Sequence, residues 1–239
     1  LRLGDYQQTE ARLNALRVFS RYRMELTPAD GERFDLTLRA AERNGYSLLS
    51  WARGLPFQTI QPQFSNIRGR AMNFDSLLRW DSNKQRIFAQ LESPVKGDPQ
   101  WGIQANLDGR RENWANPSGD FSLRRIEASA EIRAIPSGRW QWTSGATVST
   151  RHFSNQWSGG VELKYSGSVT RTLLRSPDHS LRVDASARVD AGKLFARAGL
   201  GSLRFVKVVN SASVHWRSFT FQVRVGKNVG EVPFGRRIL

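Results

Sequence analysis

The sequence predicts a mostly β fold, an incomplete antiparallel transmembrane β-barrel of about nine strands preceded by a partial α+β domain. Apolar and polar residues alternate over most of the chain after residue 66, in segments near the ~10 residues that a tilted membrane strand needs. No apolar stretch approaches the ~20 residues of a spanning helix. Hydrophobic content is 39% and mean hydropathy −0.50, which suits strands that face lipid only at every second position.

The first part of the chain, residues 1–43, predicts a helix followed by two strands. Asp5 is placed to cap a helix over 6–16, whose apolar residues recur at helical spacing. Alternating strands are expected over 19–26 and 34–40, joined by a turn containing Pro28 and Gly31. Residues 44–66 lose the alternation and contain Pro56 and Pro62, so we expect a linker there.

From residue 67 the pattern has a period of two. The first strand places Met72, Phe74, Ser76, Leu78 and Trp80 on one face and Asn73, Asp75 and Arg79 on the other. Further strands are expected within these ranges: 86–95, 101–108, 126–133, 140–148, 161–169, 181–190, 195–216 and 219–225.

Connections and tryptophans agree with a barrel. A tight turn at 136–138 alternates with a longer polar connection at 110–119, as periplasmic turns alternate with extracellular loops. Most tryptophans fall near strand ends, where a membrane interface favours them; they are Trp80, Trp101, Trp114, Trp140, Trp142, Trp157 and Trp216. The alternative is a soluble β-sandwich, whose strands average nearer ~5 to 6 residues.

The charge of +15 raises the question of nucleic-acid binding. Arginine supplies 30 of the 36 cations, and these arginines are spread singly through the alternating segments. We predict that Arg133, Asp184, Arg188 and Arg224 lie opposite the apolar face, which in a barrel is the lumen. No nucleic-acid partner is expected.

No arrangement of residues indicates catalysis or a cofactor. The chain has no cysteine, and its three histidines, His152, His179 and His215, are isolated in sequence. The run 178–180 places triad residue types side by side, but Pro177 marks a turn there. We expect no catalytic residues, no metal and no cofactor, so the protein is not expected to be an enzyme.

Several phrases resemble one family, the BamA-type outer-membrane assembly and translocation superfamily. Residues 13–26 and 35–43 look like the end of a POTRA domain. Residues 88–94, followed by Trp101, are similar to the early barrel of that family, and 226–234 resemble a phrase that precedes its large sixth extracellular loop. The first half of a POTRA domain and the Arg-Gly-aromatic motif of that loop are absent from this sequence, so we expect a truncated chain.

The resemblance implies an outer-membrane barrel of about sixteen strands, with 1–43 as the end of a periplasmic POTRA domain, 44–66 as the entry and 67–239 as the N-terminal part of the barrel. It implies contact with outer-membrane lipid, unfolded outer-membrane protein clients, and periplasmic chaperones or assembly lipoproteins. Client strands would template on an open edge. The strand from Gly69 to Trp80 would be one side of this lateral gate.

Three functions remain open from the sequence. The first is a BamA-like factor that folds and inserts client barrels, and the second is a related secretion transporter or passive pore. The third is a soluble basic β-protein that binds nucleic acid or glycan. A half barrel also leaves its edges open, so we expect the chain not to fold stably alone.

Overall fold

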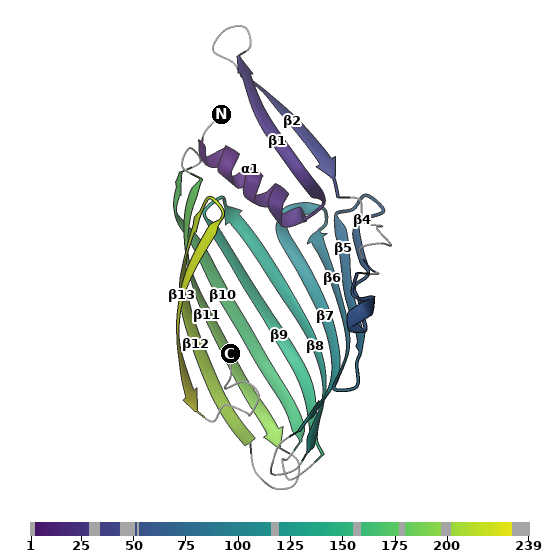
Figure 1. Ribbon diagram of the computed structural model, residues 1–239. Helices are drawn as coiled ribbons and strands as arrows, with labels where there is room; N and C mark the ends of the chain where they lie inside the picture. The colour runs from purple at the N-terminus through teal and green to yellow at the C-terminus, as the bar shows by residue number, and fades with distance from the viewer. Residues whose placement is uncertain are drawn as a thin grey trace.

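The N-terminal part of the protein is a helix followed by a long hairpin. The computed structural model describes residues 3–28, 34–43, 51, 53–115, 120–154, 159–176, 180–196 and 202–230. Helix α1 spans Leu3–Leu16, β1 spans Phe19–Pro28 and β2 spans Phe34–Glu42 (Figure 1). Arg17, with φ of 56°, ends the helix and turns the chain into β1. The predicted order of helix, strand and strand is present.

The rest of the chain forms one antiparallel sheet of eleven strands, in the order β13 to β5 and then β3, with β4 also paired to β5. Nine of these strands are long, as the alternation predicted. A short 3₁₀ turn, η1, spans Leu55–Phe57. The strands are β3 (Thr59–Ile60), β4 (Gln63–Ile67), β5 (Met72–Trp80), β6 (Lys84–Val95), β7 (Asp98–Trp114), β8 (Phe121–Ser137), β9 (Trp140–Phe153), β10 (Gly160–Ser176), β11 (Leu181–Ala196), β12 (Ser202–Trp216) and β13 (Phe219–Gly230).

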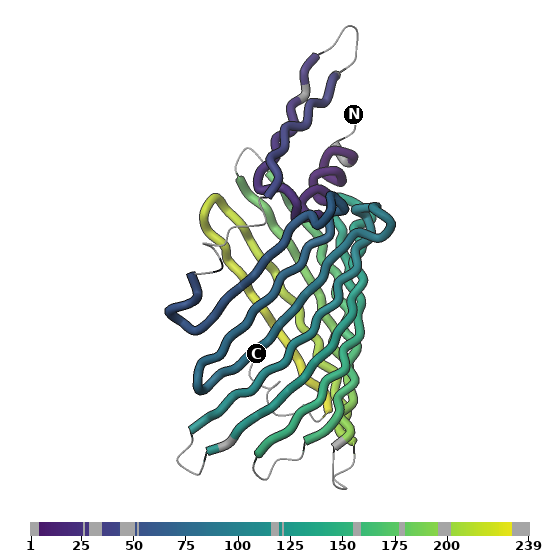
Figure 2. The backbone as a smooth tube through the Cα atoms, turned by 90° about the vertical axis from the view of Figure 1, so that its right-hand side faces the viewer, coloured from purple at the N-terminus to yellow at the C-terminus, as the bar shows by residue number. Residues whose placement is uncertain are grey.

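The sheet curves into a barrel wall that does not close. Its strands are steeply inclined to the long axis of the molecule (Figure 2). The two sides of the wall, at β3 to β5 and at β13, do not pair with each other over the part of the chain that the structure describes. The fold is therefore an incomplete antiparallel β-barrel, as the sequence predicted.

The connections differ between the two ends of the wall. At the end near α1, residues 96–97, 138–139 and 217–218 join successive strands. Lys96, Gly97 and Arg217 adopt positive φ in these tight turns. At the opposite end, the corresponding connections span 115–120, 154–159 and 197–201. Two further connections depart from this pattern, since 81–83 at the opposite end has three residues and 177–180 near α1 has four. The predicted alternation of short and longer connections therefore holds for most of the wall and not for all of it.

Two predicted features near the start of the sheet need correction. The expected linker 44–66 contains β3 and β4, although 44–50 and 52 lie outside the described residues. Both strands pair with β5, so the strand from Met72 to Trp80 is not the first of the sheet. Ser76 illustrates this, because its backbone N–H and its hydroxyl both donate to the carbonyl oxygen of Pro62, at 2.9 and 3.0 Å.

Gly69, which we assigned to that strand, precedes it. It has φ of +68° and lies in a turn before β5. Asn66 stabilises the turn, since its side-chain oxygen accepts a hydrogen bond from the backbone N–H of Ala71 at 2.9 Å. The short strands were missed because two to five residues interrupted by Pro62 show too little alternation to be recognised.

Candidate functional site

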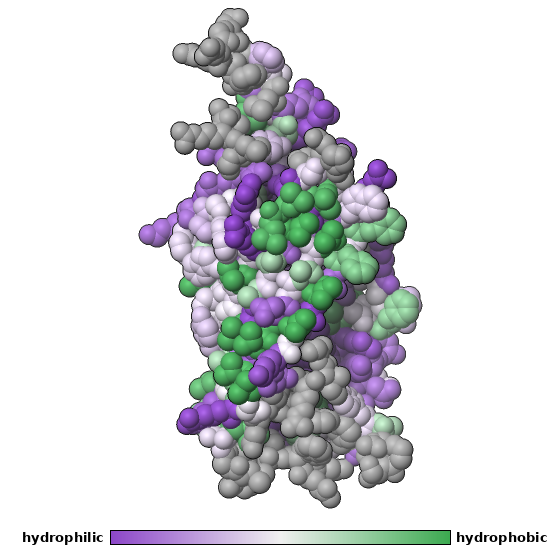
Figure 3. Space-filling view, turned by 90° about the vertical axis from the view of Figure 1, so that its left-hand side faces the viewer, coloured by the Kyte–Doolittle hydropathy of each residue, from purple (hydrophilic) through white to green (hydrophobic). Residues whose placement is uncertain are grey.

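The two faces of the sheet have the reverse of the polarity found in soluble proteins. Apolar side chains of the long strands are exposed on the convex face, and Ile126 on β8 is 67% exposed. Patches of apolar residues are visible on the side of the wall that Figure 3 shows. Polar and charged side chains are buried on the concave face. The buried polar residues are Asn73, Glu92, Asp108, Ser149, Arg151, Glu162, Lys164, Ser166 and Asp184. The concave face thus holds the polar interior.

The apolar part of the convex face has sharp limits. At the limit near α1, Trp101, Ala134 and Trp142 are register partners on the adjacent strands β7, β8 and β9. At the other limit, ten residues further along the same strands, the register partners are Arg111, Arg124 and His152. At ~3.3 Å per residue and a tilt of ~45°, ten residues rise about 23 Å. We call the apolar surface between these two limits the outward band. Its height matches the ~25 Å apolar band of a membrane barrel.

Aromatic side chains line the limit of the band that lies near α1. The rings of Trp101 and Trp142 meet edge to face, with centroids 5.5 Å apart. Trp140, Trp216 and Phe219 are exposed at the same end of β9, β12 and β13. The predicted clustering of tryptophans at strand ends agrees with this aromatic belt, although Trp80 and Trp114 end β5 and β7 at the opposite end of the wall. Trp157 lies outside the described residues.

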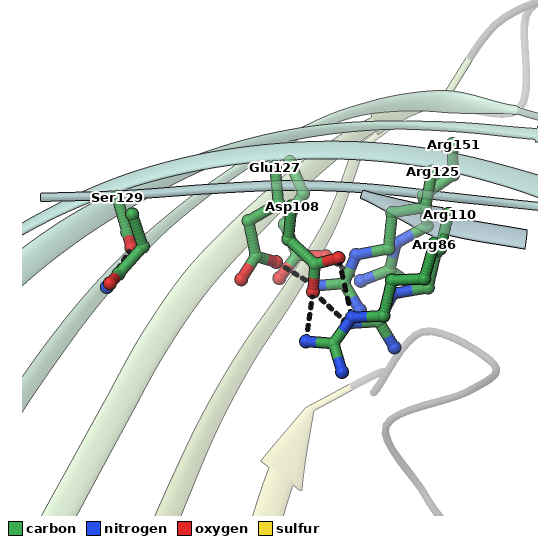
Figure 4. A network of polar contacts seen from close by, with 9 residues as sticks. Arg86, Asp108, Arg110, Arg125, Glu127, Ser129 and Arg151 are labelled. Atoms are coloured by element: carbon green, nitrogen blue, oxygen red, sulfur yellow. Dashed lines mark hydrogen bonds and ion pairs between the residues drawn. The ribbon is translucent and has the colours of Figure 1, made fainter. Parts of the chain in front are cut away.

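Four arginines form a row on the concave face, near the end of the wall opposite α1. Arg86, Arg110, Arg125 and Arg151 occupy directly paired positions on β6, β7, β8 and β9. Their side chains run in the same direction in Figure 4. The sequence did not reveal this arginine row, because each member is an isolated arginine whose neighbours are set by the strand register.

A parallel row of acids balances the arginines. Asp108, Glu127, Ser149 and Glu162 are paired in register across β7 to β10, two residues from the arginine row. Asp108 accepts two bonds from Arg86, at 3.0 and 2.9 Å, and also pairs with Arg110 (Figure 4). Arg125 pairs with Glu127, and Arg151 with Glu162. Charge pairing lets Asp108, Arg151 and Glu162 remain buried on the concave face, while the other charged members of the two rows are partly exposed.

The structure places the predicted lumenal charges on the concave face but does not gather them into one cluster. Asp184 accepts hydrogen bonds from Thr172 at 2.7 Å and Arg182 at 3.0 Å. Arg188 pairs with Asp190 at 3.1 Å.

The other two predicted charges lie on different strands. Arg133 contacts α1 and β6, as detailed below, and Arg224 occupies the position paired with Ser211, on β13.

Helix α1 lies across the end of the polar interior (Figure 1). Arg17, just after the helix, pairs with Asp75 at 3.2 Å and Glu92 at 3.1 Å. Arg133 reaches over Gly102 to pair with the same Glu92 at 2.6 Å. Partial burial lowers the pKa of Arg17, but the hydrogen bond to Glu92 and the charge of Asp75 outweigh it and raise that pKa above its ordinary value.

The helix backbone is also held directly. Arg133 donates to the carbonyl oxygen of Ala15 at 3.0 Å, and the Asn73 amide donates to that of Leu16 at 2.8 Å. These bonds satisfy carbonyls at the helix C-terminus that have no partner within the helix.

Further contacts fix the middle of the helix on three strands. Gln8 donates to the carbonyl oxygen of Pro136 at 3.1 Å, and Arg12 donates to Gln100 at 2.7 Å. Glu10 pairs with Arg175. The helix therefore covers this end of the concave face instead of hanging free beside it.

Within the described residues, no group of three or more histidine or acidic side chains is arranged to hold a metal ion. No helix in that part of the chain is long and apolar enough to cross a membrane. Asp108, Glu127 and Glu162 of the concave face are each engaged by an arginine. The sheet thus has a charged concave face and an apolar convex face.

No family model and no curated protein matches the chain. Among solved structures, it is similar to the crystal structure of BamA from Haemophilus ducreyi lacking POTRA domains 1–3. The TM-score is 0.46 and the sequence identity 8%, over 90% of this chain and 49% of that one. The chain thus spans about half the length of that structure.

Proposed function

We propose that the protein is part of the wall of an outer-membrane β-barrel, with the concave face toward the lumen and the α1 end in the periplasm. The outward band supports this most directly, because it is apolar, about as tall as a membrane core, and bounded by tryptophans on one side and by arginines and histidine on the other. In water this exposed surface would favour aggregation.

We further propose that the barrel assembles other outer-membrane proteins. The residues that resemble the end of a POTRA domain form α1, β1 and β2, and they stand at the mouth of the polar interior. Unfolded client strands would pair with an edge of the wall, where backbone N–H and C=O groups are free to template them. Periplasmic chaperones or assembly lipoproteins would deliver the clients to the hairpin.

On the present topology, the edge used for templating would belong to β3 and β4 and not to β5. Both edges of β5 are paired over much of its length, to β6 on one side and to β3 and β4 on the other. A lateral gate on this side of the wall would therefore open at residues 59–67. This assignment replaces the strand from Gly69 to Trp80.

Depletion of the protein in its own cells tests the assembly role. The amounts of several unrelated outer-membrane proteins are measured by quantitative mass spectrometry of the membrane fraction. An assembly factor predicts that many of them fall together, while inner-membrane proteins stay constant. Loss of a single client would contradict a general assembly role and favour a dedicated secretion transporter.

A pore is the second candidate, because the four arginines of the row outnumber the three carboxylates that pair with them and leave one positive charge in excess. Cationic side chains in a lumen attract anions and shape their passage. Conductance across a planar bilayer distinguishes the two functions. A pore predicts steady channels with anion preference, and that preference should weaken in Arg110→Gln. An assembly factor closed by α1 predicts little steady current.

A further inference from the structure

A shallow hollow lies on the convex face of β10 to β13, toward the end near α1. Its volume is about 460 Å³. Ala185, Ala187 and Ala212 form its floor, where neighbouring positions carry larger side chains. Val223 and Val225 of β13 border it on one side. The hollow therefore interrupts the outward band with a depression lined mainly by apolar groups.

A cation stands at the opposite border of the hollow. Arg171 faces outward from β10, paired in register with Trp140 on β9 and with Ala185 on β11. Its guanidinium carbon is 5.1 Å from the centroid of a Trp140 ring. Arg171 is exposed and forms no ion pair with any described carboxylate. It is thus a charge at the aromatic belt with its donors available.

We propose that this hollow binds a phospholipid, with one acyl chain over the alanines and the phosphate on Arg171. The inference rests on the proposed membrane location. An apolar chain would fill a depression that otherwise leaves the side chains around it without contacts. The phosphate would receive charge-assisted hydrogen bonds from a guanidinium, whose fork geometry matches its oxygens.

The position of the cation favours a lipid over a second protein as the occupant. Trp140 belongs to the aromatic belt, which marks the level of the headgroups, so Arg171 beside it lies at the depth of the phosphates. The hollow extends from Arg171 toward Val169 and Ala187, one paired row nearer the middle of the band. Headgroup and chain positions therefore follow each other in the order that a lipid requires.

Photo-crosslinking tests the site in the full chain inserted into vesicles of phosphatidylethanolamine and phosphatidylglycerol. The probe is phosphatidylglycerol with a diazirine on one acyl chain, and crosslinked peptides from β11 and β12 are quantified by mass spectrometry. Arg171→Gln is expected to lower crosslinking there by about fivefold, the effect of one cation near a membrane surface. Ala187→Phe, which fills the hollow and keeps the charge, is expected to lower it as well.

Arg217→Gln is the matched control. Arg217 lies at the same end of the wall, 5.4 Å from a Trp216 ring, but does not line the hollow. It should leave crosslinking unchanged. Equal crosslinking in Arg171→Gln and Arg217→Gln would overturn the site. A diazirine diacylglycerol, which has no phosphate, would also overturn it if it labelled β11 and β12 as strongly as the phosphatidylglycerol probe does.

The comparison of Arg171→Gln with Arg217→Gln shows whether the hollow binds a phospholipid through Arg171, even if Ala187→Phe fails to insert. It also separates this inference from the proposed function. A chain that does not enter vesicles contradicts the membrane location. A chain that enters them and shows no dependence on Arg171 contradicts only the lipid site.

Discussion

Arg151 on β9 and Glu162 on β10 form an ion pair on the concave face, with 5% and 1% of their side chains exposed. A soluble single-layer sheet has no interior in which to bury such a pair. In this protein the curved wall provides one, and the neighbouring pairs of the arginine and acid rows surround it. The pair therefore reports on the integrity of the concave face.

Removing one partner of this pair should destabilise the fold strongly. Glu162→Gln leaves the Arg151 guanidinium buried without its counter-charge, so we expect the free energy of unfolding to fall by about 3 to 5 kcal/mol. Urea unfolding from vesicles, followed by tryptophan fluorescence, measures the change.

Glu25→Gln serves as the control, because it also removes a carboxylate from an arginine pair but at the surface. Arg23 and Arg39, which pair with Glu25, are mostly exposed. Its effect should be at most about 1 kcal/mol. A loss in Glu162→Gln as small as that in Glu25→Gln would show that Glu162 is solvated and that the concave face is not an interior.

A charge in the outward band should be costly only if that band faces lipid. Leu107 is 61% exposed in the middle of the band, and Leu38 is an exposed leucine of the β1–β2 hairpin. Leu107→Arg is expected to cost about 2 to 4 kcal/mol in vesicles. Leu38→Arg, outside the membrane, should change stability by no more than about 0.5 kcal/mol. Equal small effects would place both leucines in water.

Gly138, in the turn between β8 and β9, lies against the backbone of α1. A Cβ atom there would lie 2.5 Å from the carbonyl carbon of Gln7, so Gly138→Ala should displace the helix. We expect faster tryptic cleavage after Arg12 in this variant. Gly109→Ala is the control, since its Cβ would meet nothing closer than 4.0 Å. Unchanged cleavage in Gly138→Ala would mean that the helix does not rest on this turn.

The long strands could be predicted from the sequence because one face of each strand is apolar and the other is polar. In the proposed barrel, side chains at outward positions face lipid and those at inward positions face the polar interior. Apolar and polar residues therefore alternate strongly from Met72 to Val225. The helix and hairpin were predicted for the same reason, from the spacing of apolar residues. Short strands β3 and β4 were not, because their place is set by pairing with β5 and not by their own pattern.

The candidate site was only partly predictable. The alternation predicted the polar face for Arg133, Asp184, Arg188 and Arg224, and these residues lie on the concave face. The partners of their side chains could not be predicted, because they depend on the register between strands. The arginine row and the role of Glu92, which holds both Arg17 and Arg133, arise from residues far apart in the sequence. Likewise, Arg171 is one arginine among 30 until the fold places it beside Trp140 and the hollow.

We infer that the convex face meets lipid and that the concave face does not. The chain has no cysteine, so single cysteines at 126, 127, 128 and 129 on β8 give unique sites for a nitroxide label. In vesicles, we predict high accessibility to oxygen at 126 and 128 and low accessibility at 127 and 129. Labels at 126 and 128 that are quenched by a water-soluble nickel complex and not by oxygen would contradict the account.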